Sequence, residues 1–211
     1  MKGLIYKDIQ LFFRGVDKKV LCIAAVAIVL LMTQTGPYGG LLGSILLAMT
    51  VSIQNILIFS SDESAHWLTY QRSLPVSSRQ VVAGKYLSVL CTLGVSTGGS
   101  ALLCLLSGVI HGLLSPSLLG LSIWASAVIP LLWTGLCLPL TYWFGFRAAQ
   151  LMGMVVVVPL FFLVKFFEDG PGLAAMPDTL AGLAALASGA AAVVFAVSYA
   201  ISVQGYQKAR S

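Results

Sequence analysis

The sequence predicts an all-α integral membrane protein with six transmembrane helices, and three observations lead to this fold class. Hydrophobic residues make up 58% of the 211 residues, and charged residues make up only 9%. Soluble domains are about 45–50% apolar and about 25% charged. Apolar runs of helical length recur along the chain, and they lack the alternation that is typical of barrel strands. Finally, the basic residues are confined to alternate connections between these runs.

The apolar runs define one transmembrane domain, which comprises residues 1–211. A helix needs about 20 residues to cross a hydrocarbon core about 30 Å thick. We expect the spans over residues 20–34, 38–60, 81–110, 118–144, 148–167 and 180–203. No Asp, Glu, Lys or Arg is expected well inside a span, which argues against a proton relay or a charged pore.

The basic residues predict that both termini lie in the cytoplasm. With the N-terminus inside, every Lys and Arg except Lys165 falls in or beside a cytoplasmic segment, as the positive-inside rule expects. The net charge of +5 is therefore explained by membrane topology, and no nucleic-acid partner is needed. A cleaved signal peptide is the alternative for the first run, but no small-x-small cleavage site follows it cleanly at Thr33–Thr35.

Residues 1–17 predict an amphipathic helix that lies in the membrane interface and contacts lipid. Aliphatic and aromatic residues fall near one side of this helix, and basic residues fall on another. The residues expected to carry this role are Lys7, Ile9, Phe12, Phe13 and Arg14. A simple topology anchor is the alternative.

The segment 61–80 between the second and third spans is the largest cytoplasmic connection. Ser60 and Glu63 have the spacing of a capping box, which predicts a short helix over residues 61–74. Pro75 is expected to end this helix, because the residue before a proline disfavours the helical conformation. Ser77 and Gln80 form a second capping-box pattern at the start of the next span.

This short helix is expected to present polar and aromatic side chains to a cytoplasmic partner. Tryptophan and tyrosine are enriched in binding hot spots. An aromatic belt at the membrane interface is the alternative. The candidate contact residues are Asp62, Glu63, His66, Trp67, Tyr70, Arg72, Leu74 and Pro75.

Catalytic motifs are absent from the sequence. It contains no HExxH, no GxSxG and no GxxxxGK[ST] pattern, so the chain is not expected to be an enzyme or to hydrolyse ATP by itself. The four cysteines lie in apolar runs and are expected to be small buried hydrophobic residues rather than disulfide or zinc ligands. No metal or cofactor site is expected in this chain.

Two stretches resemble a known family. Residues 73–87, SLPVSSRQVVAGKYL, resemble the SLPVSRxxIVxxKYL stretch of six-span ABC-2 type permeases, although Ser78 precedes Arg79 and shifts the basic position. Residues 1–8, MKGLIYKD, resemble the MKGLLxKDL opening of the same family. The subgroup with the greatest similarity is the small permeases of bacterial peptide exporters, such as those for phenol-soluble modulins and bacteriocins.

The resemblance implies a bacterial cytoplasmic-membrane exporter. A separate ATPase subunit would bind ATP and Mg and dock on the cytoplasmic face. Two permease chains, most simply a homodimer, would work with two ATPases. The helix in segment 61–80 would be the coupling helix, and the N-terminal helix would brace it.

The neutral interior of the spans suits an apolar or amphipathic cargo, because a strongly ionic cargo is costly to desolvate. The resemblance to peptide exporters implies that this cargo is a peptide. An exporter for bacitracin-type antibiotic resistance is an alternative of the same build. A membrane anchor or regulatory subunit without transport activity is the alternative from another class.

The distribution of basic residues makes a testable prediction about topology. A reporter that is active only in the cytoplasm should be active when it is fused after Ser211, because both termini are expected inside. A fusion that is active only outside the cell would mean that one span, most simply the short first one, has been miscounted.

Overall fold

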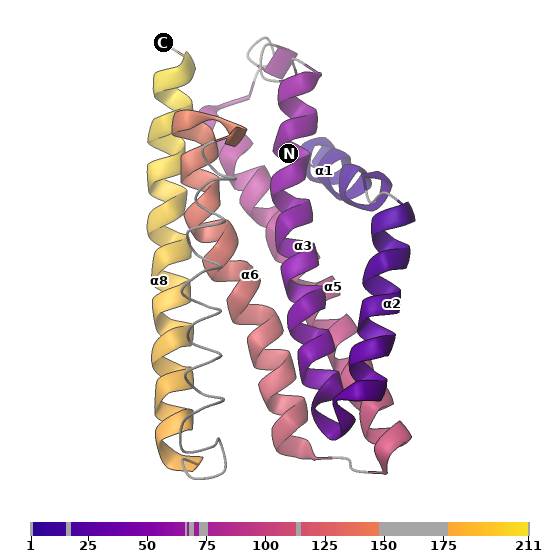
Figure 1. Cartoon of the computed structure of the whole chain (residues 1–211). Coiled ribbons are helices and arrows are strands. Elements are labelled where there is room, and N and C mark those ends of the chain that lie inside the picture. The colour runs from indigo at the N-terminus through magenta and orange to yellow at the C-terminus, as the bar shows by residue number, and fades with distance from the viewer. Residues whose placement is uncertain are drawn as a thin grey trace.

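The computed structural model describes residues 2–15, 18–65, 67, 70–71, 76–112, 115–147 and 177–210, and no strand occurs among them. Long helices run side by side, and the first helix crosses them near one end of the bundle (Figure 1). The helices are α1 (Lys2–Arg14), α2 (Lys18–Gln34), the short 3₁₀ helix η1 (Gly36–Tyr38), α3 (Gly39–Ser64), α5 (Ser78–His111), α6 (Pro116–Phe144) and α8 (Pro177–Arg210).

Four of the described helices are long and apolar enough to cross a membrane. Their apolar stretches are Gly39–Asp62, Ser78–His111, Pro116–Phe144 and Ala184–Lys208. The apolar part of α2, Cys22–Gln34, is shorter than these. The expected span over residues 148–167 lies outside the described residues. The count of six transmembrane spans therefore stays a prediction. An all-helical membrane fold, in contrast, agrees with the described part of the chain.

Helices α3, α5 and α6 pack against one another, with α2 on the far side of α3 and α8 beside α6. α1 packs against α3 and α5. The C-terminal end of α8 lies toward the same end of the bundle as α1, and α2 turns into α3 at the opposite end (Figure 1). The end that holds α1 therefore gathers the C-terminal ends of α3, α6 and α8 and the beginning of α5.

Small hydroxylated side chains fill the contacts between α3, α5 and α6. Many of these hydroxyls donate to a carbonyl of their own helix, as Ser52 Oγ does to Ala48 O at 2.7 Å. Asn55 Nδ2 on α3 also donates to Thr92 Oγ1 on α5 at 2.9 Å. Small residues and neutral hydrogen bonds are what helices in a membrane use to pack closely. The fully buried members are Ser44, Ser52, Ser96, Ser100, Ser107, Ser122, Ser126 and Thr134.

A proline inside α6 shows how these hydroxyls stabilise the bundle. Pro130 has no N–H, so the carbonyl of Ser126 loses its partner four residues later. Ser96 Oγ on α5 donates to that carbonyl at 3.2 Å. The interhelical hydrogen bond replaces the missing intrahelical one, which is how membrane helices tolerate proline.

The connection between α3 and α5 differs from the sequence prediction in one respect. The expected helix start at Ser60 is wrong, because α3 continues without a break to Ser64. Ser61, the first residue of the expected new helix, lies within α3, and its Oγ donates to Leu57 O of the preceding turn at 3.4 Å. Trp67, Tyr70 and Gln71 have helical backbone conformation.

The second capping box is confirmed at the start of α5. Ser77 Oγ accepts from the Gln80 N–H at 3.3 Å, and Gln80 Oε1 accepts from the Ser77 N–H at 3.1 Å. Both residues therefore satisfy backbone donors that the first turn of a helix leaves unpaired.

The close approach of α3 to α5 makes a prediction about stability. A Cβ added at Gly40 would lie 2.9 Å from both Cys104 Cα and Ser107 Cβ. Gly40→Ala should therefore lower the free energy of unfolding by about 1–3 kcal/mol, as overpacking does. Denaturant titration of the purified protein in detergent measures this change.

Gly94→Ala is the matched control, because among the described residues no atom outside its own stretch of helix lies within 4 Å of the Cβ position at Gly94. Its effect should be neutral or stabilising by up to about 1 kcal/mol, since alanine favours helix more than glycine does. Equal destabilisation by both variants would contradict the predicted close contact between α3 and α5.

Candidate functional site

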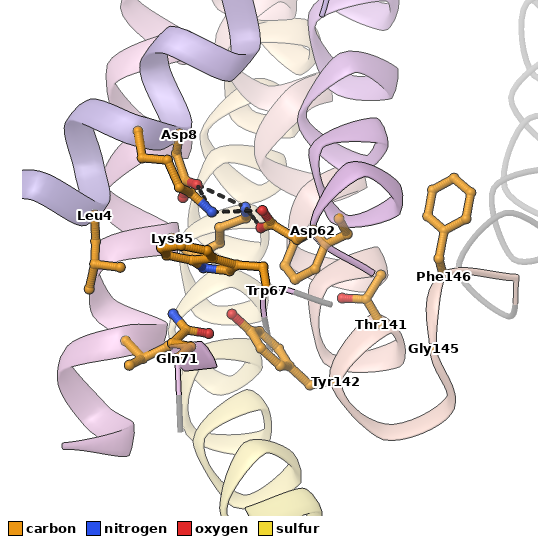
Figure 2. Close-up of a pocket in the computed structure, with 13 residues that line it drawn as sticks. Leu4, Asp8, Asp62, Trp67, Gln71, Lys85, Thr141, Tyr142, Gly145 and Phe146 are labelled. Atoms are coloured by element: carbon orange, nitrogen blue, oxygen red, sulfur yellow. Dashed lines mark hydrogen bonds and ion pairs between the residues drawn. The ribbon is translucent and has the colours of Figure 1, made fainter. Parts of the chain in front are cut away.

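Four charged side chains from three helices meet at the end of the bundle that holds α1 (Figure 2). Lys7 Nζ lies 3.3 Å from Asp8 Oδ1 and 2.7 Å from Asp62 Oδ1. Lys85 Nζ lies 3.2 Å from Asp8 Oδ1 and 3.2 Å from Asp62 Oδ2. Each charge thus contacts two charges of opposite sign. We name this closed set of Lys7, Asp8, Asp62 and Lys85 the charge ring.

The charge ring is largely shielded from solvent. The Lys85 and Asp8 side chains are 7% and 6% exposed, whereas Asp62 is 13% and Lys7 is 24% exposed. Burial of an unpaired charge costs several kcal/mol, and removal of one partner of a buried pair is strongly destabilising. The ring has equal numbers of positive and negative groups. If one member were missing, the remaining buried charges would no longer balance, so burial of the ring requires all four members.

Packing of α1 on the bundle places Asp8 in the ring. Leu4 lies against α5 at Gly84, where its Cβ is 3.7 Å from the position that a glycine Cβ would take. Phe12 packs against Val51 and Ile58 of α3. Asp8 lies between these two contacts along α1 and is turned toward the bundle.

The first turns of α5 place Lys85 and support Asp8 from the other side. Ser77 fixes the beginning of α5, two helical turns before Lys85. The single hydroxyl proton of Ser88 is shared between Lys85 O at 2.7 Å and Asp8 Oδ2 at 3.4 Å. The carboxylate of Asp8 therefore has a neutral donor in addition to its two ammonium partners.

Aromatic rings cover both ammonium groups. Lys7 Nζ lies 4.3 Å from the centroid of the Trp67 ring, and Lys85 Nζ lies 4.5 Å from that of Phe59. Such cation–π contacts are strongest where water is excluded. Trp67 in turn packs on Tyr70, with ring centroids 5.2 Å apart. These rings connect the charge ring to the segment that was expected to contact a partner.

A cavity of about 90 Å³ adjoins the charge ring. Trp67, Gln71, Thr141, Tyr142 and Phe146 line it together with the ring itself, as Figure 2 shows. Trp67 Nε1 is buried and has no hydrogen-bond partner among the described residues. The described residues include no group of His, Cys, Asp or Glu side chains that fits a metal ion.

The neighbour of Lys85 ties this end of α5 to α8. The Tyr86 hydroxyl bonds to Ser198 Oγ at 2.5 Å and to Ser202 Oγ at 2.8 Å. Tyr86 also packs edge to face on Phe195 and Tyr199. The site is therefore connected to α8 as well as to α1 and α3.

The structure brings some of the expected contact residues together. Asp62 and Trp67 meet at Lys7, and the Tyr70 side chain is 56% exposed beside them. Glu63 belongs to α3, and its side chain is not among those described. The other expected contact residues, His66, Arg72, Leu74 and Pro75, lie outside the described residues.

The residues of α1 that were expected to lie in the membrane interface differ in how far they are exposed. Phe12 is buried against α3, whereas Phe13 is exposed and Ile9 is half-buried. Arg14 is exposed, but Lys7 is turned into the charge ring and away from its expected place on a basic outer face. The helix therefore packs on the bundle on one side and exposes aromatic residues on another.

The sequence interpretation missed two members of the charge ring, Asp8 and Lys85. Lys85 is buried between the helices, and it lies about two helical turns after Ser77, near the beginning of α5. Two features of the sequence indicate the pairing. Lys85 falls inside the expected span 81–110, and Asp8 interrupts the apolar side of α1. Ionisable groups at such positions require opposite charges nearby.

A comparison with protein families gives one match. The family model described as ABC-2 family transporter protein matches residues 3–207. Neither a curated protein nor a solved structure matches the chain.

The closed pairing makes a prediction that a double-mutant cycle tests. Lys85→Met leaves two carboxylates with a single ammonium group, so the free energy of unfolding should fall by about 3–5 kcal/mol. Adding Asp8→Asn to that variant leaves a balanced Lys7–Asp62 pair. The double variant should then lose less stability than the two single variants summed, by about 0.5–3 kcal/mol. Additive losses in denaturant titrations would contradict the closed ring.

Proposed function

The chain belongs to the ABC-2 family of transporter proteins, and on that premise we propose that it is the permease subunit of an ATP-driven exporter. A permease of this family is a transport component and is not itself an enzyme. The family match and the four apolar helices also indicate a multi-pass membrane protein. The proposed location is the bacterial cytoplasmic membrane, with both termini in the cytoplasm.

Energy for transport comes, in this proposal, from a separate ATPase subunit. The sequence has no phosphate-binding loop of the GxxxxGK[ST] kind, so ATP and Mg are bound by that partner. Two copies of this permease, as a homodimer, would flank a shared path with two ATPases below them. One bundle of this size is small for a path that passes a peptide.

One observation carries the proposed coupling site: the Trp67–Tyr70 pair lies directly beside the charge ring. The pair follows the end of α3, and Lys85 lies near the beginning of α5. A partner that binds Trp67 and Tyr70 would therefore push on both helices. In the proposal, Glu63, His66, Arg72, Leu74 and Pro75 complete the contact surface, and Asp62 supports it from the bundle side.

The proposed cargo is an apolar or amphipathic molecule, most simply a peptide. Support comes from the contacts between α3, α5 and α6, which use neutral hydroxyl and amide groups. An ionic cargo would lose its hydration there without a fixed counter-charge. Antibiotic resistance of the bacitracin type fits the same build, and export assays with each cargo class distinguish the two.

Tyr70→Ala tests the coupling contact. Because an exposed aromatic residue at the centre of an interface is a typical hot spot, the variant should weaken ATPase binding by about 1–4 kcal/mol. Binding is measured between the permease in lipid nanodiscs and a purified candidate ATPase, such as one from a neighbouring gene. Export should fall in parallel, while the amount of permease in the membrane stays unchanged.

Tyr38→Ala is the matched control. Tyr38 is 58% exposed, close to the 56% of Tyr70, but it lies in η1 at the opposite end of the bundle (Figure 1). Its replacement should leave ATPase binding unchanged. Equal binding by the parent and by Tyr70→Ala would remove the proposed coupling contact. A parent that binds no ATPase would favour the anchor alternative.

A further inference from the structure

We propose that Lys7 is a positioning residue for coupling, and that its ion pair with Asp62 fixes α1 to the end of α3, so that both helices and the beginning of α5 form one rigid unit. This inference rests on the proposed function for its role in transport, but the rigid unit itself is a property of the chain alone. In this unit, a displacement at Trp67 reaches α1, α3 and α5 together instead of moving α3 alone.

The charge ring has an inner and an outer part. Lys85 and Asp8 form the inner part, where both side chains are almost completely buried and Ser88 adds a hydrogen bond. Lys7 and Asp62 form the outer part, which is partly exposed and has the shortest ion pair, at 2.7 Å. The inner part joins α1 to α5, and the outer part joins α1 to α3.

Lys7 also connects the ring to the proposed ATPase contact. Its ammonium group lies on the Trp67 ring at 4.3 Å and pairs with Asp62 at the same time. A force on Trp67 therefore acts on Lys7 through one contact and on α3 through the next. Without Lys7, Trp67 would lose its described link to α1.

Apolar packing of α1 does not fix its position in the same way. The contacts of Phe12 with Val51 and Ile58 bury apolar surface, and such burial is favourable without being directional. Charge-assisted hydrogen bonds add a preferred geometry as well as energy. Since the ring binds α1 to two helices at once, it prevents α1 from sliding along either one.

The first experiment needs no ATPase. Spin labels are placed at Tyr6→Cys on α1 and Leu42→Cys near the far end of α3, both exposed positions, in a background without Cys22, Cys91, Cys104 and Cys137. Pulsed electron spin resonance in nanodiscs should give a narrow distance distribution for the parent. Lys7→Met combined with Asp62→Asn keeps the Lys85–Asp8 pair balanced, and it should broaden the distribution. An unchanged width would overturn the inference.

A second label pair is the control for this measurement. Ile53→Cys on α3 and Val109→Cys on α5 are both exposed and neither lies on α1. Their distance distribution should be the same with and without the Lys7 and Asp62 substitutions. Broadening of this pair as well would show a general loss of packing, which also overturns a specific role for Lys7.

The second experiment tests the role in coupling. At a saturating concentration of the ATPase, Lys7→Cys with Asp62→Cys, in the same cysteine-free background, should stimulate ATP hydrolysis about tenfold less than the parent, as expected for the loss of a charge-assisted bond. A short bifunctional methanethiosulfonate cross-linker between the two cysteines should restore the stimulation, because it replaces the ion pair with a fixed link. Reduction should abolish it again.

Two results would overturn the role in coupling. One is stimulation of ATP hydrolysis by the unlinked cysteine variant to the level of the parent. The other is a linked variant that does not stimulate ATP hydrolysis, as expected if the Lys7–Asp62 pair must open in each transport cycle. Failure of the proposed function looks different, since the parent itself would then not change ATP hydrolysis. The spin-label comparison would still decide whether Lys7 fixes α1.

Discussion

Two carboxylates and two ammonium groups, those of the charge ring, are buried together where α1 crosses the bundle. Each of them must contact an opposite charge there. Lys85 and Asp8 are almost completely buried, so neither tolerates the absence of the other. This requirement determines the register of α1 along α5, because a shift by one residue would turn Asp8 away from Lys85. It also determines how far α3 extends, since Asp62 reaches the ring from the last turn of that helix. The arrangement of three helix ends thus follows from the pairing of four charges.

The rest of the bundle is held together differently. Between α3, α5 and α6, buried serine and threonine hydroxyls donate to backbone carbonyls, and Ser96 replaces the hydrogen bond that Pro130 removes. These contacts are short-range and neutral, as expected where the surroundings are hydrocarbon. The molecule therefore combines a neutral interior with a charged end. A coupling contact at the charged end acts on the part of the bundle where the interactions have the most defined geometry.

The sequence predicted the long helices well, because the length of an apolar run is a local property. The expected spans 38–60, 81–110, 118–144 and 180–203 correspond to α3, α5, α6 and α8, with ends that differ by a few residues. The capping box at Ser77 was predicted correctly, but the one at Ser60 was not. Both have the same residue spacing, yet Ser60 follows an unbroken apolar helix that continues to Ser64. Spacing alone does not indicate whether a helix is beginning or still continuing.

The site was harder to predict, because its members lie far apart in the sequence. Lys7 and Trp67 were both expected to take part in function, but on separate elements with separate roles. Their contact depends on the angle at which α1 crosses α3 and α5, and no local pattern specifies that angle. The physical rule that does reveal it is the cost of burying a lone charge. Applied to Asp8 on the apolar side of α1 and to Lys85 inside a span, it requires a partner for each, and the two requirements meet at one place. Since the other contacts described between these helices are neutral, the two charges are a good guide to how the helices are joined.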